Sequence, residues 1–122
     1  METEKFERLV SKAIEDLPEE FRERLDNIDV IVADKPAHHQ LSKIERQRGE
    51  TLLGLYEGVP LPERTHSYGF VVPDMITIFQ RPIESICKSH SEIVAEIQKV
   101  VRHEIAHHFG ISDNRLRDLG RD

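Results

Sequence analysis

Hydrophobic residues in the first part of the chain recur at three- and four-residue steps, which is the spacing of one helix face. Between Phe6 and Leu17 this spacing predicts a helix that ends before Pro18, because a proline inside a helix breaks its hydrogen bonds. Pro18 suits the first position of a second, short helix in which Phe21 and Leu25 share one face. We therefore expect the chain to begin with two helices.

The middle of the chain changes to strand-like patterns. The segments 28–33, 51–56 and 75–79 are rich in β-branched and other hydrophobic residues, and we expect each of them to form a strand. Gly54 lies inside the second of these strands, where a glycine is typical of a bulge. Glycines and prolines then interrupt the region 57–74, which predicts a long surface loop.

Two more helices are expected after the third strand. Pro82 fits the first turn of a short helix over 81–87. Ser89 and Glu92 have the spacing of a capping box, which predicts that a long helix begins there, and Gly110 suits its end. Helices followed by strands and then by helices predict an α+β fold.

Composition narrows the class of protein. A chain of 122 residues is long enough for one hydrophobic core, so we expect a single domain over 1–122. Its net charge of -6 argues against binding to nucleic acid, whose phosphates it would repel. Cys87 is the sole cysteine, which favours a reducing, cytoplasmic location. The N-terminus lacks the pattern of a secretory signal, and no apolar segment approaches the roughly 20 residues of a membrane span.

The pattern H-E-x-x-H at 103–107 is the strongest sign of chemistry in the sequence. Residues four apart on a helix point in nearly the same direction, so His103 and His107 can both reach one metal ion. Glu104 lies beside them, where a carboxylate can take a proton from a metal-activated water. This arrangement predicts a zinc site with Glu104 as the catalytic base.

Zinc requires a third protein ligand, and the sequence contains few candidates for it. No glutamate follows Glu104, which leaves Asp113 as the favoured ligand. A glycine at position 110 permits the chain to reverse after the helix and to bring Asp113 back toward the two imidazoles. The added Gly and Asp make a chance match much less frequent than for the short motif alone.

The extended pattern H-E-x-x-H-x-x-G-x-x-D resembles that of the zincin-like minimal metallopeptidases, a family of small bacterial proteins. Three further segments, 17–27, 53–61 and 73–78, are similar to segments shared in that family. The resemblance implies a small mixed sheet packed with helices and an active-site helix near the C-terminus. It also implies peptide hydrolysis, with His103, His107 and Asp113 as zinc ligands and Glu104 as base.

Substrate-binding residues are expected upstream of the motif. His66 and Tyr68 lie in the predicted loop and could donate a hydrogen bond to a developing oxyanion, the alternative being that both are ordinary loop side chains. The strand containing Thr77 could pair with an extended peptide if it forms a sheet edge, the alternative being an ordinary core strand. His108 is about 100° round the helix from His107, so we expect a structural or supporting role for it.

These observations favour a cytoplasmic zinc peptidase that acts on peptides or on an exposed segment of a protein. Three alternatives remain at this stage: a zinc-binding module without catalytic activity, a scaffold that binds no metal, and a regulatory peptidase that cuts one protein partner. The sequence does not distinguish the substrate or the oligomeric state.

Overall fold

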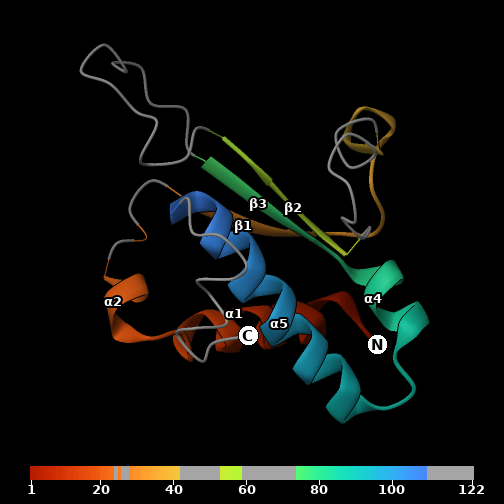
Figure 1. The fold of residues 1–122 in the computed structure, drawn as a ribbon. Coiled ribbons are helices and arrows are strands. Elements are labelled where there is room, and N and C mark those ends of the chain that lie inside the picture. The colour runs from red at the N-terminus through yellow and green to blue at the C-terminus, as the bar shows by residue number, and fades with distance from the viewer. Residues whose placement is uncertain (24, 26–27, 42–52, 59–73, 110–122) are drawn as a thin grey trace.

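The computed structural model describes residues 1–23, 25, 28–41, 53–58 and 74–109 (Figure 1). Within these residues the chain forms helices at both ends and a sheet between them, which confirms the predicted α+β class. The elements, in chain order, are α1 (Thr3–Glu15), α2 (Glu19–Arg22), β1 (Ile28–Ala33), β2 (Gly54–Glu57), β3 (Asp74–Phe79), α4 (Gln80–Ile86) and α5 (His90–Phe109).

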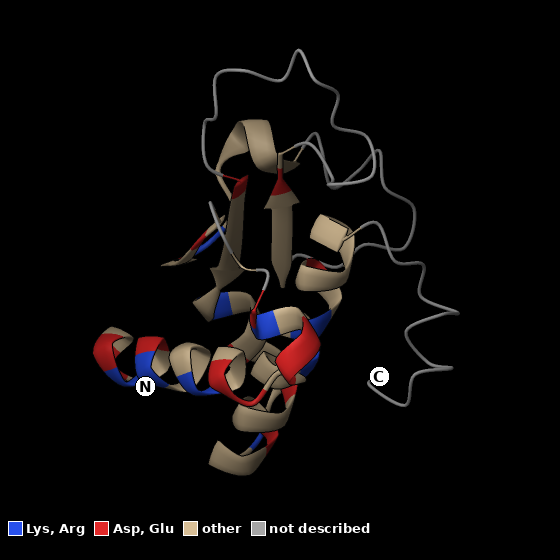
Figure 2. Cartoon of the chain, turned by 90° about the vertical axis from the view of Figure 1, so that its left-hand side faces the viewer, with Lys and Arg blue, Asp and Glu red and all other residues tan. Residues whose placement is uncertain are grey.

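The three strands form one mixed sheet in the order β1-β3-β2. β3 pairs parallel with β1 and antiparallel with β2, so it has a strand on each side. Each strand carries one acidic residue and is otherwise uncharged, as the mostly tan strands of Figure 2 show. The small mixed sheet implied by the family resemblance is therefore present.

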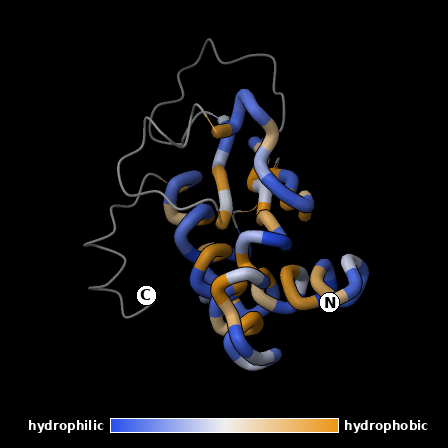
Figure 3. The backbone as a smooth tube through the Cα atoms, turned by 90° about the vertical axis from the view of Figure 1, so that its right-hand side faces the viewer, coloured by the Kyte–Doolittle hydropathy of each residue, from blue (hydrophilic) through white to orange (hydrophobic). Residues whose placement is uncertain are grey.

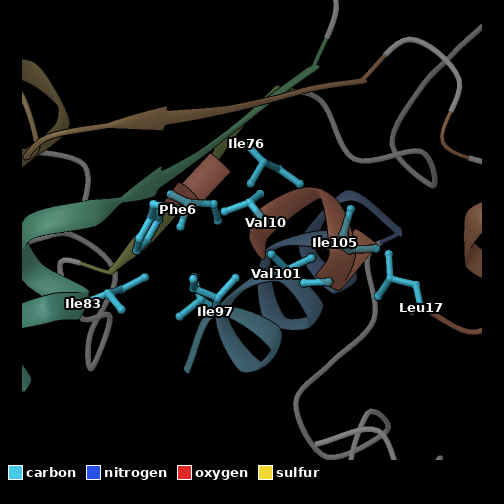
Figure 4. Packing of buried hydrophobic residues seen from close by; sticks show 11 residues of the cluster. Phe6, Val10, Leu17, Ile76, Ile83, Ile97, Val101 and Ile105 are labelled. Carbon is cyan, nitrogen blue, oxygen red and sulfur yellow. The ribbon is translucent and has the colours of Figure 1, made fainter. Parts of the chain in front are cut away.

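The long helices α1 and α5 cover the same face of the sheet (Figure 1). Their hydrophobic and hydrophilic residues alternate along the helix, as the orange and blue turns of Figure 3 show, because one side of each helix is buried. The core forms where the two helices meet the inner side of β3 (Figure 4). Its fully buried side chains include Phe6, Ile76, Ile78, Ile83, Ile97 and Val101.

Ser89 fixes the start of α5 as the sequence predicts. Its hydroxyl accepts a hydrogen bond from the Glu92 amide at 3.2 Å and donates to the Glu92 carboxylate at 3.3 Å. One of the amides left without a partner in the first turn of the helix is thereby satisfied. From this start the helix reaches Phe109, the last residue described, so the predicted end at Gly110 lies outside the described residues.

Gly54 does not form the expected bulge. The pairing of β2 with β3 runs one residue to one, from Gly54 opposite Ile78 to Glu57 opposite Met75. The glycine instead lies where α5 approaches the sheet closely: a Cβ atom on Gly54 would lie 2.6 Å from a methyl carbon of Val100. A missing side chain, rather than an extra residue, is what this position requires.

None of the helices in the described part of the chain is both long and apolar enough to cross a membrane.

Candidate metal centre

Three polar side chains come together on the last two turns of α5. The rings of His103 and His107 lie side by side with their centroids 4.5 Å apart, as residues four apart on a helix should. Glu104 places its Oε1 atom 3.4 Å from Nδ1 of His107. One ligand atom from each of the three residues lies within 4.8 Å of the other two.

This group fits a metal ion. Two nitrogen atoms bound at about 2.0–2.1 Å to one tetrahedral ion lie roughly 3.4 Å apart, so a span of this size needs only small side-chain rotations. Imidazoles and carboxylates are donors that zinc accepts. Of the described residues, only His103, Glu104 and His107 form a group of three or more possible ligands.

Burial divides the group into two parts. The side chain of His107 is 29% exposed and that of His103 is also partly exposed, whereas the side chain of Glu104 is only 3% exposed. The difference follows from the helix: Glu104 is one residue, or about 100°, from His103 and faces the sheet. The site thus has imidazoles partly open to solvent and a buried carboxylate beneath them.

The sheet accommodates Glu104 because Gly54 lies below it. A Cβ atom on Gly54 would come within 3.3 Å of the Glu104 Cγ atom and within 2.6 Å of Val100. Val100 and Glu104 are four residues apart, so they form one row of side chains along the sheet-facing side of α5. The glycine allows this row to lie directly on β2.

The next residue in the same row is His108, which is fully buried. Its Nδ1 atom lies 2.8 Å from Oδ2 of Asp74, at the start of β3, and the Tyr56 hydroxyl donates to the same oxygen at 2.6 Å. His108 therefore faces the sheet and lies outside the group of candidate ligands, in agreement with the structural or supporting role expected for it. We refer to the half-buried Tyr56 and the fully buried Asp74 and His108 together as the buried triad.

Gly58 closes the triad from the end of β2. A Cβ atom at this position would lie 2.6 Å from both Cγ and Oδ1 of Asp74. The backbone of Gly58 can approach the carboxylate only because the glycine has no side chain. Asp74 itself is 1% exposed.

The predicted site residues are only partly within the described structure. His103, Glu104 and His107 are brought together as the motif predicts. Asp113, His66 and Tyr68 lie outside the described residues, so their roles as third ligand and as substrate-binding residues stay predictions.

The expectation for Thr77 is wrong. It required an edge strand, but β3 lies in the middle of the described sheet, with Thr77 opposite both Ile31 and Leu55. The side chain is 1% exposed and alternates along the strand with Ile76 and Ile78, which pack toward the helices, so it points to the other face. Neither its backbone nor its side chain is placed to receive a peptide.

Tyr56 and Asp74 are functional candidates that the sequence patterns do not single out. Both lie within predicted strands or at their margins, where nothing in the spacing marks a polar contact. The one available signal is that Asp74 and Tyr56 are polar residues beside hydrophobic runs, and a buried polar group requires a partner.

Comparison with known proteins agrees with this geometry. The profile of the zincin-like metallopeptidases matches residues 25–121, which include all three strands and the whole of α5. The chain belongs to the zincin-like metallopeptidase family. None of the curated proteins matches the chain.

A solved structure also resembles this zincin-like protein. It is that of a conserved hypothetical protein from T. thermophilus, with a TM-score of 0.57 and 24% sequence identity. The alignment covers 99% of this chain and 100% of the other. At this identity the likeness supports the fold, and within that fold the His and Glu group on α5 is a site compatible with a metal ion.

Proposed function

We propose that this protein is a zinc-dependent peptidase in which His103 and His107 bind the metal and Glu104 is the catalytic base. One observation carries the proposal: two partly exposed imidazoles and one buried carboxylate converge on a single helix, with ligand atoms within 4.8 Å. Membership of the zincin-like metallopeptidase family supports the same assignment. Asp113 completes the proposed ligand set.

Zinc supplies Lewis acidity when bound: it polarises a carbonyl group and lowers the pKa of a coordinated water to about 7. Glu104 accepts the proton of the attacking water at a carboxylate oxygen and afterwards delivers it to the nitrogen of the leaving amine. General acid–base catalysis of this kind contributes roughly 10²- to 10⁴-fold to a rate. β2 lies directly beneath the Glu104 side chain at Gly54, and this packing is proposed to keep the carboxylate beside the imidazoles during the proton transfers.

An extended peptide is the substrate form that the sheet favours. Among the described strands, β2 has a neighbouring strand on one side only, and it lies directly under Glu104 through Gly54. A peptide paired with the open side of such a strand gains main-chain hydrogen bonds. We therefore assign the peptide-binding role first expected of Thr77 to β2 instead.

The test separates metal binding from catalysis. Glu104→Gln keeps the shape of the side chain but loses the basic oxygen, so we expect it to bind zinc as the wild type does and to lose hydrolysis by about 10²-fold or more. His107→Ala should lose the metal. Zinc content is measured by metal analysis after purification without chelator, and hydrolysis is measured on a library of extended peptides.

His90→Ala is the matched control, because His90 is an exposed histidine at the far end of the same helix. It should leave both measurements unchanged. Zinc binding by the wild type without cleavage of any peptide would identify a metal-binding module instead of a peptidase. A Glu104→Gln variant as active as the wild type would show that another group is the base.

A further inference from the structure

We propose that the buried triad of Tyr56, Asp74 and His108 is a positioning device that sets the rotation of α5 about its axis, and through it the geometry of the metal site. The inference rests on the proposed function, since it concerns how the same site is held. It assigns a role to three side chains that lie outside the group of candidate metal ligands.

The triad converges on one carboxylate. Two hydrogen bonds converge on a single atom, Oδ2 of Asp74, from His108 at 2.8 Å and from Tyr56 at 2.6 Å. The three residues come from α5, β3 and β2, so the triad joins the helix to two strands at once. His108 is 0% exposed and Asp74 is 1% exposed, which removes water as a competing partner.

His108 lies on the same helix as the reactive groups, at fixed angles from them around the helix axis. His108 follows Glu104 by four residues and His107 by one, so it differs from Glu104 by about 40° and from His107 by about 100° around the helix. A rotation of α5 that moved His108 away from Asp74 would turn Glu104 away from its place over Gly54. It would also turn both imidazoles. The direction of the bond between His108 and Asp74 therefore fixes all three reactive groups together.

Hydrophobic packing alone would not fix the rotation of α5 as narrowly. Apolar contacts are non-directional, and a helix can slide or rotate while it keeps much of its apolar area buried. A hydrogen bond to a buried carboxylate is directional, and the loss of one partner leaves a buried charge incompletely solvated. The close approach of Gly58 to Asp74 adds to this restraint, because it leaves the carboxylate little room to follow a moving helix.

The test compares variants of the triad with a matched control on the same sheet. Tyr56→Phe removes one hydroxyl from the triad, and Asp74→Ala removes the shared acceptor. Asp74→Asn restores an acceptor oxygen of the same size and is the conservative rescue. Thr77→Val is the control: it removes a buried hydroxyl from β3, on the face turned away from α5.

Two measurements are made on each folded variant, with folding checked by circular dichroism. Zinc affinity is determined by competition with a chromophoric chelator, and the visible absorption spectrum of the Co²⁺-substituted protein reports coordination geometry. We expect Asp74→Ala to weaken zinc binding by roughly tenfold or more and to shift the Co²⁺ bands, which is the effect typical of losing a group that orients metal ligands. Tyr56→Phe should act in the same direction by a smaller factor, and Asp74→Asn should recover part of the loss.

Unchanged affinity and an unchanged Co²⁺ spectrum in Asp74→Ala would overturn the inference. If Asp74→Ala fails to fold, an unchanged zinc affinity and an unchanged Co²⁺ spectrum in Tyr56→Phe would overturn the inference. An equal loss of zinc affinity in Thr77→Val would also overturn the inference, because any weakening of the sheet would then weaken the metal site. The proposed function is tested separately. If the wild type binds no zinc, both the proposed function and the role of the triad are refuted. If His107→Ala loses zinc while the triad variants bind it as the wild type does, the proposed function stands and the role of the triad is refuted.

Discussion

Replacing Gly54 with alanine tests whether the sheet sets the position of α5. The new Cβ atom would lie 2.6 Å from Cγ1 of Val100 and 3.3 Å from Cγ of Glu104. Carbon atoms normally pack at about 3.5–4.0 Å, so the first contact overlaps by roughly 1 Å. Val100 is 7% exposed and β-branched, and such a side chain has one strongly preferred rotamer in a helix. The helix must therefore move away from β2.

The sign of the stability change separates this clash from an ordinary glycine replacement. In an unconstrained strand, alanine is more stable than glycine by about 0.5–1 kcal/mol. Overpacking of a buried contact costs about 1–3 kcal/mol, which exceeds that gain. We expect Gly54→Ala to lower the free energy of unfolding by about 1–2 kcal/mol. With an m-value of about 1.5 kcal/mol/M, the urea midpoint falls by about 1 M.

Urea unfolding of the metal-free protein, in the presence of a chelator, is the appropriate assay, because bound metal would add its own stabilisation. Val100→Ala is the partner variant. The double variant should be more stable than the two single changes predict by about 1 kcal/mol, since the alanine methyl at position 54 fills the space that Val100 leaves. A Gly54→Ala protein as stable as the wild type, or more stable, would show that α5 does not rest on Gly54.

Two further predictions concern other parts of the chain. Burial raises the pKa of the Cys87 thiol, and the charges of Glu96 and Glu92 raise it further. At pH 8 the alkylation of Cys87 by iodoacetamide should therefore be slower in the folded than in the urea-unfolded protein, and faster in Glu96→Gln than in the wild type. Equal rates in both comparisons would contradict this account. Asp113→Ala should weaken zinc binding by about tenfold or more in a chelator competition, whereas Asp118→Ala should not, and equal affinities would remove Asp113 from the ligand set.

The sequence predicts the individual elements well because their causes are local. β1 forms over the segment 28–33 as expected, and α1 has its buried residues at the predicted three- and four-residue steps. The order of the strands has no such local cause. One signal was nevertheless available: the run Met-Ile-Thr-Ile-Phe in β3 lacks polar alternation, which is typical of a strand buried on both faces. That pattern indicates a central strand and excludes the edge expected around Thr77.

The site shows the same division between local and distant causes. His103, Glu104 and His107 meet because a helix places residues three and four apart together, so the sequence suffices to predict them. The buried triad joins residues 34 positions apart in the chain, His108 and Asp74, and no helix or strand period relates them. Such contacts depend on the sheet order and on the packing of α5, which only the structure provides.

The row of side chains that α5 turns toward β2 explains how one helix can be both a core element and part of a candidate metal site. The row passes from Val100 to Glu104 to His108, which are 7%, 2% and 0% exposed. A helix that served only packing would continue this row with apolar residues. Here Val100 packs by apolar contact, Glu104 is accommodated by a missing side chain, and His108 is bound by a directional hydrogen bond. Two buried polar residues cost stability, and here a specific feature of the sheet accommodates each of them: the glycine beneath Glu104 and the Asp74 carboxylate beside His108.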